Sequence, residues 1–323
     1  MPVVDELYGQ PLIESGMDME VCRNAWCSFT ETTCDGGGNR DMARIRASDE
    51  SLGHLFSPSV GRETEGWLPC GVCTVRSTAD KVWAICPHRL FAFGPNGVSD
   101  KHLPLAKKIY SLAGFRPGEQ VNVWSEITLQ ERAISSGQLF RYRLDYVLRS
   151  VEPNAPPIIV EVMTCSTSGG NTEKGTNIQA AFKRAVLFAH TPAKDPVQCP
   201  TVNVRQVWAR MASQLIAKSE AANSWGGRTI WIVQDLLADY IRTQTALPLD
   251  DLHSPDWTPD EVNMLVADLN GPVALYAGPI RPRGKDQACW MEILGAAHLP
   301  SKAAITSKLR ERNYLTSARA PLE

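Results

Sequence analysis

LFRYRLDYVLRSVEPNAPPIIVEVMTCSTSGG, residues 139–170, contains two strand-like segments joined by a proline-rich turn. In the first segment apolar and polar residues alternate, which is the period-two pattern of a β-strand. In the second, Glu161 shares one face with Ile159 and Met163. Asp145 is the acid of the first segment. Burying an ionised carboxylate in a sheet is costly unless it meets a cation, so the two acids either lie on solvated faces or share a positive partner.

A third acid lies just upstream, in a further alternating segment. VNVWSEITL, residues 121–129, carries Glu126, and the Ser-Ser-Gly sequence at 135–137 favours a tight hairpin turn. A hairpin closed there sets Glu126 directly opposite Asp145, and paired side chains on one face have Cβ atoms roughly 4.5–5.5 Å apart. Carboxylates that converge in this way repel one another unless a hard divalent cation binds between them. The sequence therefore predicts a Mg²⁺ site.

The composition is that of an ordinary globular chain of 323 residues with a formal net charge of −2. The chain has no apolar run of about 18 residues, the length that a membrane span requires. Its first ten residues lack the basic-then-apolar pattern of a signal peptide. We therefore expect a cytoplasmic protein that does not enter a membrane. The charge balance is slightly positive around the three acids, which permits DNA binding without requiring it.

Six of the nine cysteines lie in the loop-rich segment 1–92: Cys22, Cys27, Cys34, Cys70, Cys73 and Cys86. In a reducing compartment, clustered cysteines indicate a metal site rather than disulfides. Four thiolates can hold a tetrahedral zinc or a single iron, and the alternative is a set of scattered buried thiols. A Gly-Pro-Asn-Gly turn follows at residues 94–97. We therefore predict two domains, a metal-binding domain over 1–92 and a second domain over 93–323.

Two later segments have the periodicity of amphipathic helices. The first, residues 176–190, places Gln179 and Lys183 one turn apart. The second, residues 204–221, has five arginine, glutamine and lysine residues outside its apolar stripe: Arg205, Gln206, Arg210, Gln214 and Lys218. Arginine and glutamine can form paired hydrogen bonds with guanine and adenine edges, so we expect this helix to bind DNA, although a solvated helix face has the same pattern. Other patterns indicate a helix at 103–115, a strand at 228–235, a helix at 236–244 and a C-terminal helix.

Together these segments resemble the NotI family of type II restriction endonucleases. The similarity runs from about residue 27 to about residue 241 and rests on GVC ending at Cys73, ICPHRL around Cys86, FRYRLDYVL, PPIIVEVMTCSTSGG, RQVWARMASQLIAKSE and WGGRTIWIVQDLLADYI. The resemblance implies an α/β fold with a PD-(D/E)XK nuclease core, in which helices flank a central mixed β-sheet. It also implies a loop-rich N-terminal element in which four cysteines hold one iron.

The resemblance further implies roles for particular residues. Asp145 and Glu161 would bind the catalytic Mg²⁺, with Glu126 as an auxiliary acid. The structural metal, iron or zinc, would be bound by Cys27, Cys34, Cys73 and Cys86. Cys70 is an alternative member of that set.

One position departs from the family pattern. The residue two places after the strand glutamate is usually a lysine that activates water, and here it is Met163. A thioether neither takes a proton nor orients a water molecule well. The nearest substitutes in the sequence are Gln179 and Lys183 on the following helix and Lys174 in the loop before it. Alternatively, a metal-bound water needs no such partner.

We therefore expect a homodimeric type II restriction endonuclease. It would cleave double-stranded DNA at a GC-rich, palindromic site by Mg²⁺-dependent hydrolysis, because two-fold symmetric proteins match two-fold symmetric sites. One alternative is a metal-stapled DNA-binding protein whose nuclease core is inactive. A third hypothesis, a cysteine-rich redox protein, explains neither the three acids nor the Arg/Gln helix.

Overall fold

The computed structural model describes residues 1–12, 17–37, 45–46, 52–63, 66–77, 81–132, 139–168, 176–190, 195–244, 257–278 and 300–321. The chain forms two compact units. Unit 1 comprises Met1–His102 and Thr164–Val207, and unit 2 comprises Leu103–Met163 and Trp208–Glu323. Unit 1 thus includes a segment that the sequence analysis assigned to the second domain. The predicted boundary between residues 92 and 93 stays a prediction.

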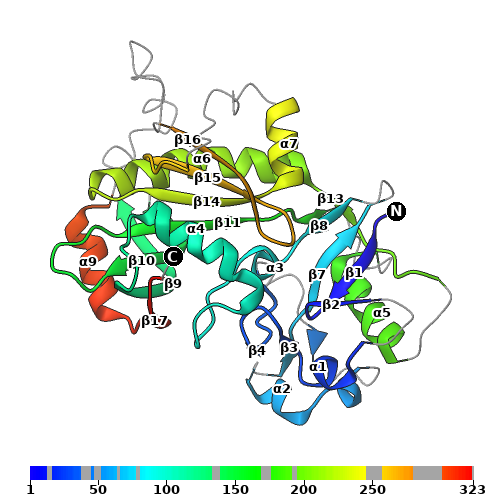
Figure 1. Cartoon of the computed structure of the whole chain (residues 1–323). Coiled ribbons are helices and arrows are strands. Elements are labelled where there is room, and N and C mark those ends of the chain that lie inside the picture. Colours follow the sequence, from blue (N-terminus) through cyan, green and yellow to red (C-terminus); the bar gives the residue numbers. More distant parts are fainter. Residues whose placement is uncertain are drawn as a thin grey trace. The chain divides into compact units, whose positions relative to one another are not determined.

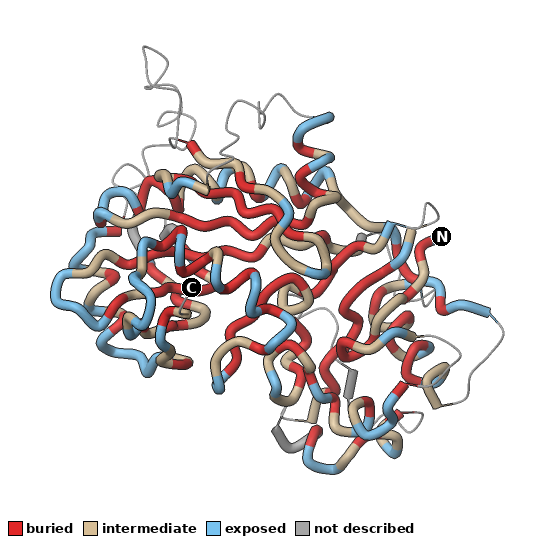
Figure 2. Tube along the Cα trace, viewed as in Figure 1, coloured by how far each residue is buried: buried red, intermediate tan, exposed pale blue. Residues whose placement is uncertain are grey.

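Unit 2 is built on a seven-stranded mixed sheet of order β16-β15-β14-β11-β10-β9-β17 (Figure 1). Its strands are β9 (Gln120–Arg132), β10 (Leu139–Ser150), β11 (Ile158–Met163), β14 (Thr229–Gln234), β15 (Val262–Ala267), β16 (Pro272–Gly278) and β17 (Thr316–Arg319). β11, β14 and β15 are parallel, and the remaining neighbours pair antiparallel. The parallel strands are buried almost throughout, as expected for strands covered on both faces (Figure 2).

Most of these strands follow from the sequence pattern. The segments predicted as strands at 121–129, 140–149, 158–163 and 228–235 form β9, β10, β11 and β14, whereas β16 was not predicted as a strand. β15 was not predicted, because its apolar sequence VNMLVA lies within an acidic region of the chain. β17 was also missed, since its sequence TSAR has no apolar alternation and its strand conformation depends on pairing with β9.

Helices flank this sheet. α4 (Leu103–Ala113) contacts β14 and β16, α7 (Asp235–Gln244) contacts β14 and β15, and α9 (Lys302–Glu311) contacts β9. α6 (Val204–Ser224) and α9 pack against β9, β10 and β11 through one buried cluster: Trp124, Ile127, Leu129, Tyr142, Leu144, Val147, Ile159, Ala221, Ala222, Trp225, Ile305 and Leu309. The predicted mixed α/β class, with a large mixed sheet flanked by helices, is confirmed.

Unit 1 consists of short elements. Its strands are β1 (Val3–Leu7), β2 (Gln10–Pro11), β3 (Trp26–Cys27), β4 (Thr32–Thr33), β5 (Ile45–Arg46), β6 (Trp67–Leu68), β7 (Val72–Arg76), β8 (Val82–Ala84), β12 (Thr167–Ser168) and β13 (Thr201–Val202). Its helices are α1 (Met19–Arg23), α2 (Pro58–Glu63), α3 (Pro87–Leu90) and α5 (Ile178–His190), with 3₁₀ turns η2 (Gly53–Leu55) and η3 (Asp100–His102). β2, β1, β7 and β8 form a four-stranded sheet.

The first hairpin of unit 1 turns within two residues. β1 and β2 are joined by Tyr8 and Gly9, whose φ angles are 52° and 77°. Two consecutive residues with positive φ form the type I′ turn that matches the twist of a hairpin.

None of the helices in the described part of the chain has the length and apolar character needed to cross a membrane.

Candidate active site and cysteine cluster

The register of β9 and β10 agrees with the hairpin predicted from the sequence. Leu144 pairs with Ile127 and Tyr146 pairs with Ser125, so Asp145 lies opposite Glu126. The turn itself, residues 133–138, lies outside the described residues. Glu126 has a φ of 53°, a left-handed conformation that is uncommon for a residue with a side chain. The two strands are therefore locally irregular at the position where the two acids face each other.

Asp145 and Glu161 lie side by side on β10 and β11. Tyr146 pairs with Val160, and the next position of the ladder sets Asp145 opposite Glu161. The backbone N–H of Val162 donates a hydrogen bond of 3.0 Å to Asp145 Oδ2, which holds this carboxylate against β11. Asp145 is half-buried, whereas Glu161 is only 1% exposed. The structure thus brings together the two acids that the sequence analysis placed at the centre of the site.

Glu161 has a cationic partner from α6. The Nζ of Lys218 lies 2.5 Å from Glu161 Oε2, and both side chains are buried. The Lys218 ammonium also lies 5.7 Å from the centre of the ring of Trp231, the residue that pairs with Glu161 on β14. Ser219 and Thr229 share a hydrogen bond of 2.7 Å, which ties this turn of α6 to the sheet.

The second carboxylate oxygen of Glu161, Oε1, does not accept a hydrogen bond from Lys218. Glu161 Oε1 is buried and has no hydrogen-bond partner among the described residues. Burial, and after it the neighbouring Asp145, raise the pKa of Glu161, whereas Lys218 lowers it; together they bring this pKa to about 8. A buried carboxylate oxygen without a donor, beside a second carboxylate, fits a hard divalent cation such as Mg²⁺, which takes oxygen ligands. The donor set therefore fits the metal that the sequence predicts.

Glu126 is differently placed from the other two acids. Its carboxylate forms an ion pair of 3.0 Å with Arg143, and its backbone oxygen accepts a 2.7 Å hydrogen bond from Arg312. The Glu126 side chain is 40% exposed. Within the described ranges, no group of three or more His, Cys, Asp or Glu side chains is arranged to hold a metal ion. Glu126 therefore does not complete a three-carboxylate site with Asp145 and Glu161.

A groove opens between β9 and α9 beside Glu126. Its lining includes two basic side chains, Lys308 and Arg312, and one acidic side chain, Glu311, which forms an ion pair of 3.5 Å with Lys308. The lining residues are Thr128, Leu129, Gln130, Ala304, Ser307, Lys308, Glu311 and Arg312. Exposed Arg141 and Arg143 lie on β10, the strand that pairs with this part of β9. Basic and hydroxyl side chains of this kind suit an anionic backbone.

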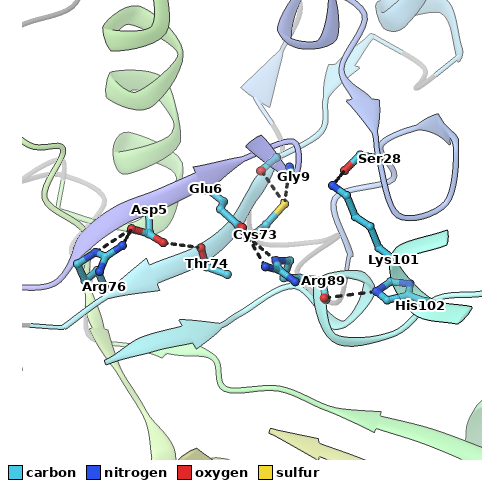
Figure 3. Close-up of polar contacts among 11 residues, drawn as sticks. Asp5, Glu6, Gly9, Ser28, Cys73, Thr74, Arg76, Arg89, Lys101 and His102 are labelled. Carbon is cyan, nitrogen blue, oxygen red and sulfur yellow. Dashed lines mark hydrogen bonds and ion pairs between the residues drawn. The ribbon is translucent and has the colours of Figure 1, made fainter. Parts of the chain in front are cut away.

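In unit 1, two cysteine sulfurs accept backbone hydrogen bonds. The N–H of Gly9 donates to Cys73 Sγ at 3.2 Å (Figure 3), and the N–H of Gly36 donates to Cys34 Sγ at 3.3 Å. The left-handed turn between β1 and β2 aims the Gly9 N–H at this sulfur. Gly37 (φ 58°) approaches Cys86 so closely that a Cβ there would lie 2.7 Å from the sulfur. The same two sulfurs also donate weak hydrogen bonds, Cys34 to Cys70 O and Cys73 to Gly71 O. Amide donors of this kind would stabilise thiolates if a metal were bound, because a negative sulfur is the better acceptor.

Four cysteine thiols influence one another electrostatically. The pKa of Cys34 is raised well above its usual value, first by burial and then by Cys27 and Cys86. The pKa of Cys73 is raised by a side-chain hydrogen bond with Cys86, by burial and by its neighbours Cys86, Cys27 and Cys34. These four of the predicted set are joined by Cys70, its alternative member, whose pKa is raised by burial and also by Cys86. They gather in one buried region, although among the described residues they do not adopt the geometry of a closed metal site.

The remaining predicted residues are distributed over both units. Gln179 and Lys183 lie on α5 of unit 1, and Lys174 lies outside the described residues, so their suggested roles with water stay predictions. Arg205, Gln206 and Arg210 are exposed on α6. Lys218, which was predicted to contact DNA with them, is 5% exposed and pairs with Glu161 instead. The DNA contact predicted for Lys218 stays a prediction.

The partnership between Lys218 and Glu161 was not predicted, although the sequence contains a signal for it. Lys218 lies seven residues after Met211 and four before Ala222, both fully buried, so it falls on the buried stripe of α6. A lysine on such a stripe requires a buried anion, because an unpaired buried ammonium is costly.

No protein-family model matches the chain, and no curated protein matches it significantly.

Proposed function

We propose that this protein is a Mg²⁺-dependent endonuclease of the PD-(D/E)XK type that cleaves double-stranded DNA. One observation carries the proposal: Asp145 and Glu161 lie side by side on neighbouring strands, and a buried oxygen of Glu161 has no hydrogen-bond partner in the described part of the chain. The resemblance to NotI-family restriction endonucleases supports the same chemistry. It also supports a homodimer acting on a palindromic, GC-rich site.

The chain's own residues would prepare the site before DNA arrives. The Val162 N–H holds Asp145 Oδ2, and Lys218 holds Glu161 Oε2, so the other oxygen of each carboxylate would be left for a cation. Mg²⁺ held there would lower the pKa of a bound water and offset the charge that develops on the phosphate. Hydrolysis adds this water across one P–O bond, leaving a phosphate on one new DNA end and a hydroxyl on the other. Basic side chains of the groove beside Glu126, such as Lys308, would contact neighbouring phosphates.

The cysteine cluster would stabilise unit 1 through a second metal. We propose that Cys27, Cys34, Cys73 and Cys86 bind one iron or zinc ion, which fits their burial, their mutual influence and the amide donors to two of the sulfurs. A thiolate set of this kind supplies folding free energy rather than catalysis. Met163 supports a second candidate function, a metal-stapled DNA-binding protein without cleavage activity, because it leaves the usual lysine position without a charge.

Plasmid cleavage separates these candidates. The wild-type protein should convert supercoiled plasmid into discrete linear fragments in Mg²⁺ and leave it intact in EDTA. Asp145→Asn and Glu161→Gln should abolish cleavage and retain DNA binding in a gel shift with Ca²⁺, because neither acid needs to contact a base. Plasmid that stays intact with wild-type protein, Mg²⁺ and detectable specific binding favours the inactive DNA-binding protein.

A further inference from the structure

We infer that Lys218 is the positioning lysine of the Asp145–Glu161 site: α6 delivers the positive charge that the strand itself lacks at Met163. This inference rests on the proposed function. Met163 lies two residues after Glu161 on the same face of β11 and contributes no charge. Lys218 contributes an ammonium to the same carboxylate from a different element, 57 positions further along the chain.

The packing around Lys218 fixes this charge in place. The helix turn that carries it is anchored by the hydrogen bond between Ser219 and Thr229, and by Ala221, Ala222 and Trp225 in the core cluster. The ammonium also approaches the ring of Trp231, a favourable cation–π arrangement. A lysine side chain has many rotamers in solvent, and this environment selects one of them. The position of the charge is therefore determined before any ligand binds.

A purely structural ion pair is a weaker explanation of the same contact. Burying an ion pair often contributes little net stability, because desolvation of both groups offsets their attraction. A pair retained only for folding is expected to satisfy the polar atoms of both partners. Here Lys218 engages one carboxylate oxygen while Oε1 has no partner among the described residues. The arrangement leaves Glu161 oriented and one oxygen available, which is what a ligand to a second cation requires.

Relocating the charge tests the inference. We would compare the wild type with Lys218→Met, with Met163→Lys, and with the double variant Lys218→Met/Met163→Lys, which moves the lysine to the strand. Lys107→Met is the matched control, because it makes the same replacement at an exposed cation of α4 that has no proposed role in the site or in DNA binding. Single-turnover cleavage, DNA binding in Ca²⁺ and thermal unfolding with and without Mg²⁺ would be measured for each.

Lys218→Met should lower the single-turnover rate by about 10²-fold or more, a loss of the size seen when a group acting in the transition state is removed. DNA binding in Ca²⁺ should stay near that of the wild type, and the double variant should regain about tenfold or more in rate. Mg²⁺ should raise the unfolding temperature of Lys218→Met more than that of the wild type, because the metal is then the only cation for the acid pair.

Several outcomes would overturn the inference. The first is a Lys218→Met protein that cleaves at nearly the wild-type rate. The second is a double variant that regains wild-type stability but cleaves no faster than Lys218→Met. If Lys218→Met does not fold, the double variant decides the matter, because it restores a lysine beside Glu161. A wild-type protein that binds DNA but never cleaves it would instead remove the proposed function, and this inference with it.

Discussion

Glu126 lies opposite Asp145 across β9 and β10, yet its carboxylate pairs with Arg143 and its φ angle is 53°. A residue that is strained and already paired with an arginine is expected to tune the site rather than to hold its metal. Glu126→Gln should therefore reduce cleavage by less than about tenfold, whereas Asp145→Asn should reduce it by about 10³-fold or more. Single-turnover rates at saturating protein measure both. Equal losses would place Glu126 among the metal ligands.

Removal of a thiolate from the cysteine cluster should unfold unit 1 locally. We expect Cys27→Ser and Cys73→Ser to lower soluble yield and bound metal together, because a structural metal site contributes folding free energy. Cys199→Ala is the matched control, since Cys199 is equally buried but is not part of the predicted ligand set. Elemental analysis should give one iron or zinc per wild-type chain. Wild-type protein that is folded, active and free of both metals would contradict this prediction.

His102 should make the stability of unit 1 depend on pH. Its ring stacks on Phe29, accepts a 3.2 Å hydrogen bond from the Ala92 N–H and contacts the Arg89 carbonyl (Figure 3). Burial lowers the pKa of His102 from 6.5 to about 4. The unfolded chain therefore binds a proton below pH 6.5 that the folded chain binds only near pH 4. The corresponding stabilisation is present above pH 6.5 and is lost as the pH falls towards 4.

This loss should be on the order of 3 kcal/mol between pH 7 and pH 4, from about 1.36 kcal/mol for each unit of pKa shift. Urea unfolding at several pH values measures it. His102→Asn keeps an acceptor for the Ala92 N–H but does not titrate, so its unfolding free energy should change less over the same range. A parallel pH dependence in the two proteins would show that other groups are responsible.

DNA binding should depend strongly on salt and should involve α6. Arg205 and Arg210 are exposed on this helix. Each should contact either a phosphate or a base. Loss of a phosphate contact lowers the slope of log binding constant against log salt concentration by roughly 0.9. Loss of a base contact costs about 1–3 kcal/mol of sequence discrimination. Lys107→Ala, which removes an exposed charge from α4, is the control. Unchanged affinity and unchanged sequence preference in both arginine variants would make α6 a scaffold only.

The sequence predicted the part of the site that depends on local periodicity. Alternation placed Asp145 and Glu161 on neighbouring strands, and turn chemistry set the register that brings Glu126 opposite Asp145. The partners of these acids depend on tertiary packing and were not predicted. The pairing of Lys218 with Glu161 joins residues 57 positions apart. This lysine was expected on the polar face of α6 because of its charge, although its spacing from Met211 puts it on the buried stripe.

The fold was predictable to a similar extent. Strands and helices with a clear hydrophobic periodicity were predicted. β15 was not predicted because acidic residues surround it in the sequence, and β17 was not predicted because its strand conformation depends on pairing with β9. The discontinuous composition of unit 1 was not predicted either, since α5 joins it through tertiary contacts such as those with α1 and β1. Composition and turn signals show where chain segments end, but they do not show which segments come together.

The most direct test of the acid pair as a metal site is a change of metal preference. Asp145→Cys replaces a hard carboxylate ligand with a softer thiolate, which binds Mg²⁺ poorly and Mn²⁺ or Cd²⁺ better. Plasmid cleavage by this variant should be lost in Mg²⁺ and partly restored in Mn²⁺ or Cd²⁺, while Glu126→Cys should keep cleaving in Mg²⁺. Wild-type cleavage by Asp145→Cys in Mg²⁺ would contradict the assignment of Asp145 as a metal ligand.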